Sequence, residues 1–231
     1  MTYDELVTAV SSYTENTFPT ADMDTFIQQA ETRIYNSIQF PALRKNVTGT
    51  ITAYNAVSNP RAMYLNCPDD FLAVYSFAII DADGNYEYLL NKDVNFIRQA
   101  YPNPNDQALP KYYALFGPTT TGTNPIQLTN ELSLIVGPTP DASYSVELHY
   151  FFYPESITVS STGTTWLGDN FDSVLLYGTL VEAYTYMKGE TDMMALYDGK
   201  YKEALGLAKR LGDGMERGDA YRDGQYKQAV T

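Results

Sequence analysis

The single histidine of the chain, His149, is the first residue whose chemistry could support catalysis or metal binding. It lies two residues after Glu147, so that in an extended strand both side chains point to the same face. Metal sites and acid–base sites usually combine several such groups, whereas this chain has one histidine and one cysteine. The pattern therefore favours a strand histidine that makes an ordinary hydrogen bond.

Cys67 is the only cysteine, so no disulfide can form within the chain, which fits assembly in a reducing cytoplasm. It lies between Asn66 and Pro68, which indicates the end of a strand. No histidine lies near it in the sequence to activate it as a nucleophile. We expect a structural thiol.

Two loops contain part of a motif that binds calcium or phosphate. Asp81-Ala-Asp83-Gly84 resembles the start of a calcium loop, but an EF-hand needs glycine at its sixth position and glutamate at its twelfth. Here the glycine is fourth and Lys92 is twelfth, so the segment predicts a tight hairpin turn instead. Gly117 and Gly122 have the spacing of a phosphate-binding loop, but Thr123-Asn124 replaces the lysine and hydroxyl residue that hold the phosphates.

Two pairs of carboxylates could form a glycosidase site: Asp69 with Asp70, and Asp169 with Asp172. Such enzymes hold two carboxyl groups about 5–10 Å apart across a sugar cleft, a distance that the sequence does not show. Each pair also has a local role, the first in a turn after Pro68 and the second at the start of a long helix. The residues therefore favour a protein that is not an enzyme and needs no cofactor or metal.

The composition is that of a globular protein with one large domain or two small ones. Apolar residues make up 44% of the 231 residues and charged residues 19%. Twenty-eight acidic residues against 15 basic ones give a net charge of −13, which argues against a protein that coats nucleic acid or binds an anionic membrane. We expect no membrane span, because no apolar run approaches roughly 20 residues, and no signal peptide.

Hydrophobic periodicity divides the chain into helical and strand regions. Residues 1–43 have apolar positions at helical spacing, and the helical period returns in residues 165–211. Between them, residues 44–164 alternate with period two and contain turn signals, which predicts an antiparallel sheet or small sandwich. We therefore predict an α+β protein in which N- and C-terminal helices form one bundle with an inserted antiparallel β domain. An extended, flexible C-terminal tail follows at residues 212–231.

Tyrosine is unusually frequent, with 21 copies against ten phenylalanines. A tyrosine ring buries a large apolar area while its hydroxyl keeps a hydrogen bond, which suits contacts between subunits. About half of these tyrosines are expected in the core of the β region. We predict that subunit packing uses residues of the two C-terminal helices: Phe171, Leu175, Tyr184, Tyr197 and Tyr201.

The basic residues are concentrated near the C-terminus. Residues 1–199 contain 8 basic and 23 acidic side chains, whereas residues 200–231 contain 7 and 5. A basic, tyrosine-containing tail on an acidic body is suited to bind an acidic or aromatic groove on a partner. The predicted partner-binding residues are Arg210, Arg217, Tyr221, Arg222, Tyr226 and Lys227.

Short motifs spread over residues 26–181 resemble the adaptor, or head-to-tail connector, proteins of short-tailed and related tailed bacteriophages. No single motif is diagnostic, but their order and spacing are specific. One departure is the threonine-rich segment 117–125, which is longer than in the family. The motifs are Phe26-Ile-Gln-Gln-Ala-Glu-Thr-Arg33-Ile34-Tyr35, Pro68-Asp-Asp-Phe71-Leu72, Tyr88-Leu-Leu-Asn-Lys92, Tyr101-Pro102, Pro110-Lys-Tyr-Tyr113, Gly137-Pro-Thr-Pro-Asp141, Glu147-Leu-His-Tyr150, Thr165-Trp-Leu167 and Leu175-Leu-Tyr-Gly-Thr-Leu-Val181.

The resemblance implies a structural virion protein at the neck of the particle. Such proteins form a ring, commonly of twelve copies, that docks beneath the portal protein and above the tail nozzle or hub. The genome passes through the bore without sequence-specific binding. By this resemblance the helical bundle builds the ring, the C-terminal tail binds the portal, and the β domain faces outward or towards tail components such as fibres. The family has no catalytic residues, so the resemblance assigns none.

Two other functions fit the same residues. The aromatic-rich β region could belong to a carbohydrate-binding or depolymerising tail component, whose activity would not depend on the C-terminal tail. The chain could also be a tail-completion or neck protein at another level of the same particle. Binding to purified portal protein and to purified nozzle protein would separate this last function from that of the adaptor.

Overall fold

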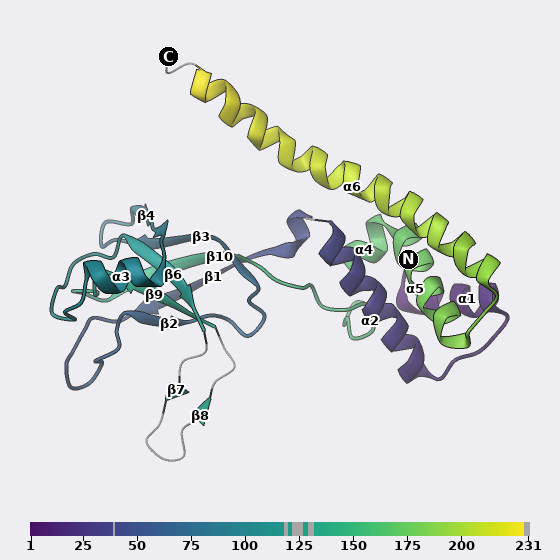
Figure 1. Cartoon of the computed structure of the whole chain (residues 1–231), viewed down its shortest axis with the longest axis horizontal. Helices are drawn as coiled ribbons and strands as arrows, with labels where there is room; N and C mark the ends of the chain where they lie inside the picture. The colour runs from purple at the N-terminus through teal and green to yellow at the C-terminus, as the bar shows by residue number, and fades with distance from the viewer. Residues whose placement is uncertain (39, 118–119, 122–126, 129–131, 229–231) are drawn as a thin grey trace. The chain divides into compact units, whose positions relative to one another are not determined.

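The computed structural model describes the backbone of residues 1–38, 40–117, 120–121, 127–128 and 132–228. It also describes the side chains of these residues, with the exception of residues 41, 120–121, 127–128 and 213–228. The chain divides into two compact units (Figure 1). One comprises Met1–Leu43 with Tyr153–Thr231, and the other comprises Arg44–Phe152. The protein is α+β, as predicted, with helices at both ends of the chain and antiparallel-rich sheets between them.

Helices form the first unit, and α5 is the central one. It packs against α1, α2, α4 and α6, and its residues Leu175, Leu180 and Ala183 have no exposed surface. Buried and partly buried positions over most of its circumference agree with the largely apolar composition of this helix. The helices are α1 (Tyr3–Thr14), α2 (Thr20–Ser37), α4 (Trp166–Asn170), α5 (Asp172–Met187) and α6 (Thr191–Gln228), with a 3-10 turn at Pro41–Leu43.

Three helices approach one another closely at Gly178 of α5. A Cβ atom at this position would lie 3.2 Å from the Cβ of Ala30 on α2 and 3.3 Å from the ring of Tyr201 on α6. Both distances are shorter than an ordinary van der Waals contact, so a larger residue would push the neighbours away. The glycine thus sets how closely α2 and α6 pack on α5.

Residues 153–164 belong to the helical unit, whereas we expected the β domain to extend to residue 164. The buried backbone N–H of Ile157 donates a hydrogen bond to Oε1 of Glu31 on α2 at 3.0 Å. Nε2 of Gln28 on the same helix donates to Oγ1 of Thr158, also at 3.0 Å. These contacts, which join positions far apart in the chain, hold the segment on α2.

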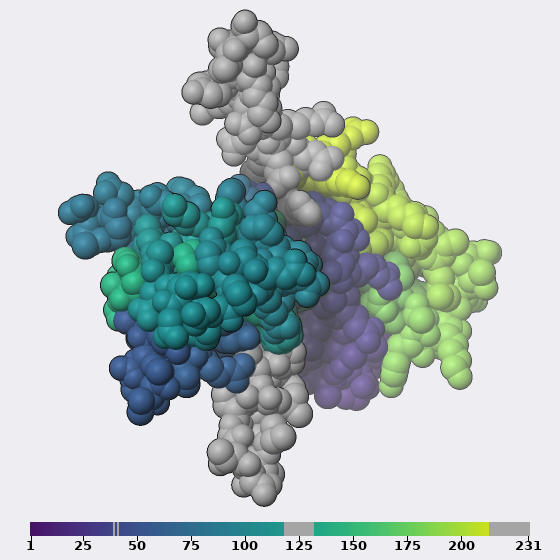
Figure 2. Space-filling model, turned by 60° about the vertical axis from the view of Figure 1, so that its left-hand side comes forward, coloured from purple at the N-terminus to yellow at the C-terminus, as the bar shows by residue number. Residues whose placement is uncertain are grey.

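Helix α6 extends to Gln228, whereas we expected regular structure to end near Leu211. The residues after Gly212 include alanine, arginine, glutamate and glutamine, which favour helix, and no proline. Adding residues to an existing helix needs no new nucleation, so the helix continues. The described part of α6 lies at the surface of the helical unit in Figure 2, coloured green to yellow. Among the described residues, no helix combines the length and apolar character needed to cross a bilayer.

The second unit is a sandwich of two four-stranded sheets. The first sheet, entirely antiparallel, has the order β1 (Arg44–Ile51), β10 (Tyr144–Phe151), β3 (Ala73–Ile80) and β4 (Tyr86–Tyr88). The second has the order β2 (Tyr64–Asn66), β9 (Ser133–Gly137), β6 (Tyr112–Phe116) and β5 (Leu90–Asn91), with β5 parallel to β6. A separate antiparallel pair is formed by β7 (Thr120–Thr121) and β8 (Gln127–Leu128). Residues such as Phe77 and Leu148 of the first sheet share one core with Leu134 and Val136 of the second.

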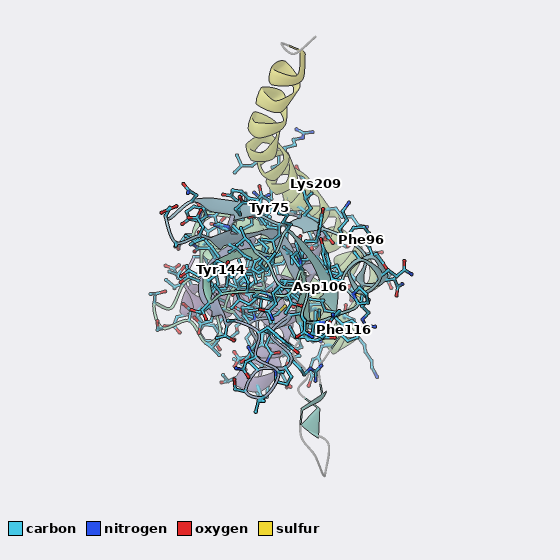
Figure 3. The ribbon with its side chains drawn as sticks, turned by 90° about the vertical axis from the view of Figure 1, so that its left-hand side faces the viewer. Tyr75, Phe96, Asp106, Phe116, Tyr144 and Lys209 are labelled. Carbon is cyan, nitrogen blue, oxygen red and sulfur yellow. The ribbon has the colours of Figure 1, made fainter. Side chains whose placement is uncertain are left out.

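Helix α3 (Val94–Ala100) covers the outer face of the second sheet. Ile135 of β9 points away from the core between the sheets and packs against Ile97 of α3, because successive strand residues face opposite sides. Phe96 of α3 and Phe116 of β6 lie on the same side of this unit in Figure 3. The second sheet is therefore covered on both faces.

We expect Gly178→Leu to lower the free energy of unfolding by roughly 1–3 kcal/mol, because the new side chain meets Ala30 and Tyr201 at once. Urea denaturation followed by circular dichroism measures the change. Gly199→Leu is the matched control, since a Cβ atom at Gly199 of α6 would have no neighbour within 4 Å among the described residues. It should be neutral or stabilising by up to about 1 kcal/mol through helix propensity. Equal effects of the two substitutions would contradict this role of Gly178.

The stability of the helical unit should fall as the pH rises above about 4.5, because of Glu31. Burial raises the pKa of this carboxyl above its usual value of 4.5, against the opposing effect of hydrogen bonds from Ser156 and Ile157. A raised pKa in the folded state means that the contribution is complete below the unfolded pKa and is lost as the pH passes the folded pKa.

Glu31→Gln should therefore reduce the pH dependence of the unfolding free energy measured in urea between pH 4 and pH 8. The amide still offers an oxygen to the Ile157 N–H but does not titrate. Glu155→Gln, which removes an exposed carboxyl from the same unit, is the control and should retain the wild-type slope. An unchanged slope in Glu31→Gln would refute the assignment.

Candidate functional site

His149 lies on the outer face of the first sheet and has polar neighbours at both ring nitrogens. Its Nδ1 is 3.2 Å from Oγ of Ser76, and its Nε2 is 3.4 Å from Oε1 of Glu147. Glu147 also accepts a hydrogen bond from Nδ2 of Asn46 at 3.3 Å, and its hydrogen bond with Tyr86 raises the pKa of that phenol. The geometry agrees with a hydrogen-bonded strand histidine.

The thiol of Cys67 is buried at the end of β2, next to the strand boundary that its neighbours indicate. Burial raises the pKa of the thiol to about 12. The nucleophilic form of cysteine is the thiolate, which is scarce at neutral pH when the pKa is this high. This environment supports a structural role for Cys67.

Two of the four carboxylates considered for hydrolysis, Asp70 and Asp169, have structural partners. Asp70 accepts hydrogen bonds from Nζ of Lys45 and from the hydroxyl of Tyr150, each at 2.8 Å. The hydrogen bond from Lys45 lowers the pKa of Asp70. Asp169 accepts a hydrogen bond from Oγ1 of Thr164 at 2.6 Å at the start of α4. Each group thus stabilises a local connection in the fold.

The segment that resembles a calcium loop is the hairpin turn between β3 and β4, as predicted. Oδ1 of Asp81 accepts hydrogen bonds from the backbone N–H groups of Asp83 at 2.9 Å and Asn85 at 2.8 Å. Gly84 has φ +85°, a value that favours glycine. In the part of the chain that the structure describes, no cluster of three or more His, Cys, Asp or Glu side chains could hold a metal ion.

The five residues predicted to pack between subunits lie in the helical unit of a single chain. Leu175, Tyr197 and Tyr201 are buried there. Phe171 and Tyr184 are half-buried and make aromatic contacts within the same chain. These side chains stabilise the fold of the helical unit within one chain, and their role in packing between subunits stays a prediction.

Helix α6 has exposed apolar residues on one face. Leu196, Leu207 and Leu211, which we call the leucine stripe, are 51%, 61% and 49% exposed. With 3.6 residues per turn they lie within about 60° of one another around the helix axis. Lys200 and Glu203 lie on the same face and form an ion pair of 3.5 Å. The stripe could pack against a second helix, and leucine spacing was the signal in the sequence that could have identified it.

All six residues predicted to bind a partner belong to α6. Arg210 is exposed, beside the exposed Lys209, which Figure 3 labels. At 1.5 Å per residue, positions 210–227 extend along about 26 Å of the helix. The side chains of the other five, Arg217, Tyr221, Arg222, Tyr226 and Lys227, lie outside the described residues, although their backbone is helical.

The outer face of the first sheet also has exposed aromatic side chains. Tyr75, Tyr86 and Tyr88 are all more than half exposed. The rings of Tyr86 and Tyr88 stack with their centroids 6.4 Å apart and an angle of 26° between their planes. Because Glu147 and Asn46 lie on the same face, aromatic surface and hydrogen-bonding groups are available together.

These features define a class of protein: an α+β protein with candidate binding surfaces on a helix and on the outer face of a sheet. The family model described as SU10 adaptor protein matches residues 1–225. The chain belongs to this adaptor family, which confirms the resemblance to phage adaptor proteins. The family is one of structural virion components. No curated protein matches the chain.

Proposed function

We propose that the protein forms the adaptor ring that joins the capsid portal to the tail nozzle or hub and lines part of the DNA conduit. Membership of the adaptor family supports the general role. The distribution of charge is the observation that carries the assignment to a position between portal and nozzle. Most of the chain is acidic, whereas its last long helix contains nearly half of the basic residues. That helix provides a connection from the ring to a neighbouring protein.

The ring is built by the helical unit, residues 1–43 and 153–211, from copies of this chain, commonly twelve. The leucine stripe of α6 is an exposed apolar surface on this unit, and a neighbouring copy would bury it. The aromatic side chains of α5 and α6 support the stripe from inside the same unit. The β unit, residues 44–152, is then available to tail components, including fibres.

Charge also supports the role as a conduit. Residues 1–199 carry 23 acidic against 8 basic side chains. Duplex DNA has one negative charge per roughly 1.7 Å of axis, so an acidic wall repels it and the genome slides without sticking. The function requires no catalysis, cofactor or membrane, and the protein acts in the neck of the virion after assembly in the host cytoplasm.

The end of α6 is the portal-binding element in this proposal. We expect a chain that ends at Leu211 to keep its fold, because the buried side chains that the structure describes in the helical unit precede this point, and to lose binding to purified portal protein. Circular dichroism measures the fold, and sedimentation or electron microscopy measures attachment. Normal attachment of the shortened chain to portal would exclude this role for α6. If the full-length chain binds nozzle protein but not portal, the protein belongs at another level of the neck.

A charge-matched comparison tests the basic residues themselves. Arg217→Gln with Arg222→Gln should weaken portal binding at least tenfold at low salt, with a smaller effect at high salt. Lys200→Gln with Lys202→Gln removes the same charge from the same helix outside the predicted binding segment. This control should bind within about twofold of wild type; an equal loss in both variants would indicate a nonspecific effect of net charge.

A carbohydrate-binding tail component is a second candidate, favoured by the stacked and exposed Tyr86 and Tyr88 beside Glu147. It predicts that the full chain binds a host surface glycan, and that Tyr86→Ala with Tyr88→Ala abolishes this binding while portal attachment is unchanged. A glycan array followed by calorimetry measures it. Lack of glycan binding by the wild-type chain would eliminate this candidate.

A further inference from the structure

The β unit has an apolar groove along one side of the sandwich. Its volume is about 420 Å³, and it lies between the edge strand β1 of the first sheet and the edge strand β2 of the second. Its apolar lining includes Phe77, Val146 and Leu148 from the first sheet and Leu65 and Leu134 from the second. Among the described residues, no charged side chain lines the groove. The volume falls within the range of roughly 300–1,000 Å³ that is typical of binding pockets.

Strand β1 leaves both a backbone edge and part of the groove available. It pairs with β10 over Arg44–Ile51, and no strand among the described residues pairs with its other edge. Val47 and Gly49 lie opposite Leu148 and Val146, which point into the core, so these two positions face the groove. Val47 is 38% exposed and Gly49 has no side chain, so the groove remains open beside them.

These properties specify the kind of segment that the groove can bind. An edge strand presents unpaired N–H and C=O groups, to which an extended segment can add as a further strand. The apolar lining requires apolar side chains at positions i and i+2 of that segment, since alternate strand residues share one face. The uncharged character of the described lining favours an uncharged segment.

An uncharged part of this chain, which includes the threonine-rich segment 117–125, has the required sequence. Residues 112–130 form the longest run without a charged residue. Within that run, Ile126 and Leu128 alternate with the polar Gln127 and Thr129. The backbone of residues 127–128, which form β8, is extended.

We propose that the groove of one copy binds residues 125–129 of a second copy as a strand added beside β1, with Ile126 and Leu128 directed into the groove. The inference rests on the proposed function in that a ring supplies the neighbouring copy. Donor segment and acceptor groove are different surfaces of the chain, so each copy donates to the next. A head-to-tail contact of this kind closes into a ring when the rotation between copies allows it.

Two variants separate the donor from the acceptor. Gly49→Leu fills the groove, and the strand accommodates the new Cβ because it would lie 3.5 Å from Cγ2 of Val146, an ordinary contact. Leu128→Asp places a charge in the donor segment and leaves the groove intact. Each variant alone should self-associate at least tenfold more weakly than wild type in sedimentation velocity. Val57→Asp, at a position 92% exposed in the same unit, is the control and should associate as wild type.

The decisive measurement is the 1:1 mixture of the two variants. Gly49→Leu keeps a functional donor and Leu128→Asp keeps a functional groove, so the mixture should form a heterodimer at least tenfold more tightly than either variant alone. A mixture that associates no more tightly than its components overturns the proposal, whatever the wild-type chain does. Circular dichroism of each variant confirms that the fold is retained.

A disulfide identifies which copy supplies the segment. Cys67 lines the groove, so Leu128→Cys should form a disulfide with Cys67 of another chain during oxidation at alkaline pH, which increases the thiolate fraction of this buried thiol, while Val57→Cys should not. A disulfide within one chain would mean that the groove binds its own segment, which overturns the assignment to a second copy. Portal binding by Gly49→Leu is measured separately. If Gly49→Leu still binds portal and self-associates as wild type does, the groove contact is refuted and the adaptor assignment is not. If the wild-type chain does not bind portal, the adaptor assignment is refuted and the groove contact is not.

Discussion

The close approach of α2, α5 and α6 at Gly178 is the constraint on which the helical unit depends. With no side chain at the crossing, Ala30 and Tyr201 reach the backbone of α5, and the apolar faces of three helices are buried together. That packing determines which face of α6 is left outside. The leucine stripe is exposed because the opposite face of the helix, with Tyr197 and Tyr201, is already buried in the same chain.

The β unit presents the complementary case, in which packing is incomplete along one edge. Leu148 and Val136 pack in the core between the sheets, and Ile97 packs in the core beneath α3. At the edge of the first sheet, however, the inward-facing position of β1 is Gly49, which has no side chain to fill the space. The helical unit thus has an apolar surface on α6, and the β unit has one between two edge strands, on a chain with a net charge of −13. Burying these apolar surfaces in an assembly would lower the free energy of association, because it removes them from water.

Local periodicity was sufficient to predict most elements, because burial of one face dominates their stability. Helix α5 and strands β3 and β10 follow directly from apolar spacing. Contacts between distant segments could not be predicted in this way: Glu31 finds its backbone partner, Ile157, 126 residues away. Leu211 is 49% exposed, and local spacing alone does not show whether a leucine of α6 faces the other helices or the solvent. The groove depends on which strands are sheet edges, and sheet order is a property of the whole β unit.

In the proposed adaptor ring, the length of α6 has a consequence for how faithfully a virion is completed. At 1.5 Å per residue its 38 residues extend about 57 Å, and glycines at positions 214, 218 and 224 lower the helix propensity of its last turns. A helical segment of low propensity is only marginally stable by itself, so a single docked copy would gain little from its contact. Several copies joined in a ring gain the sum of their contacts. Partial rings would then dissociate before the genome is sealed, whereas a closed ring would remain, which makes attachment a check on completeness.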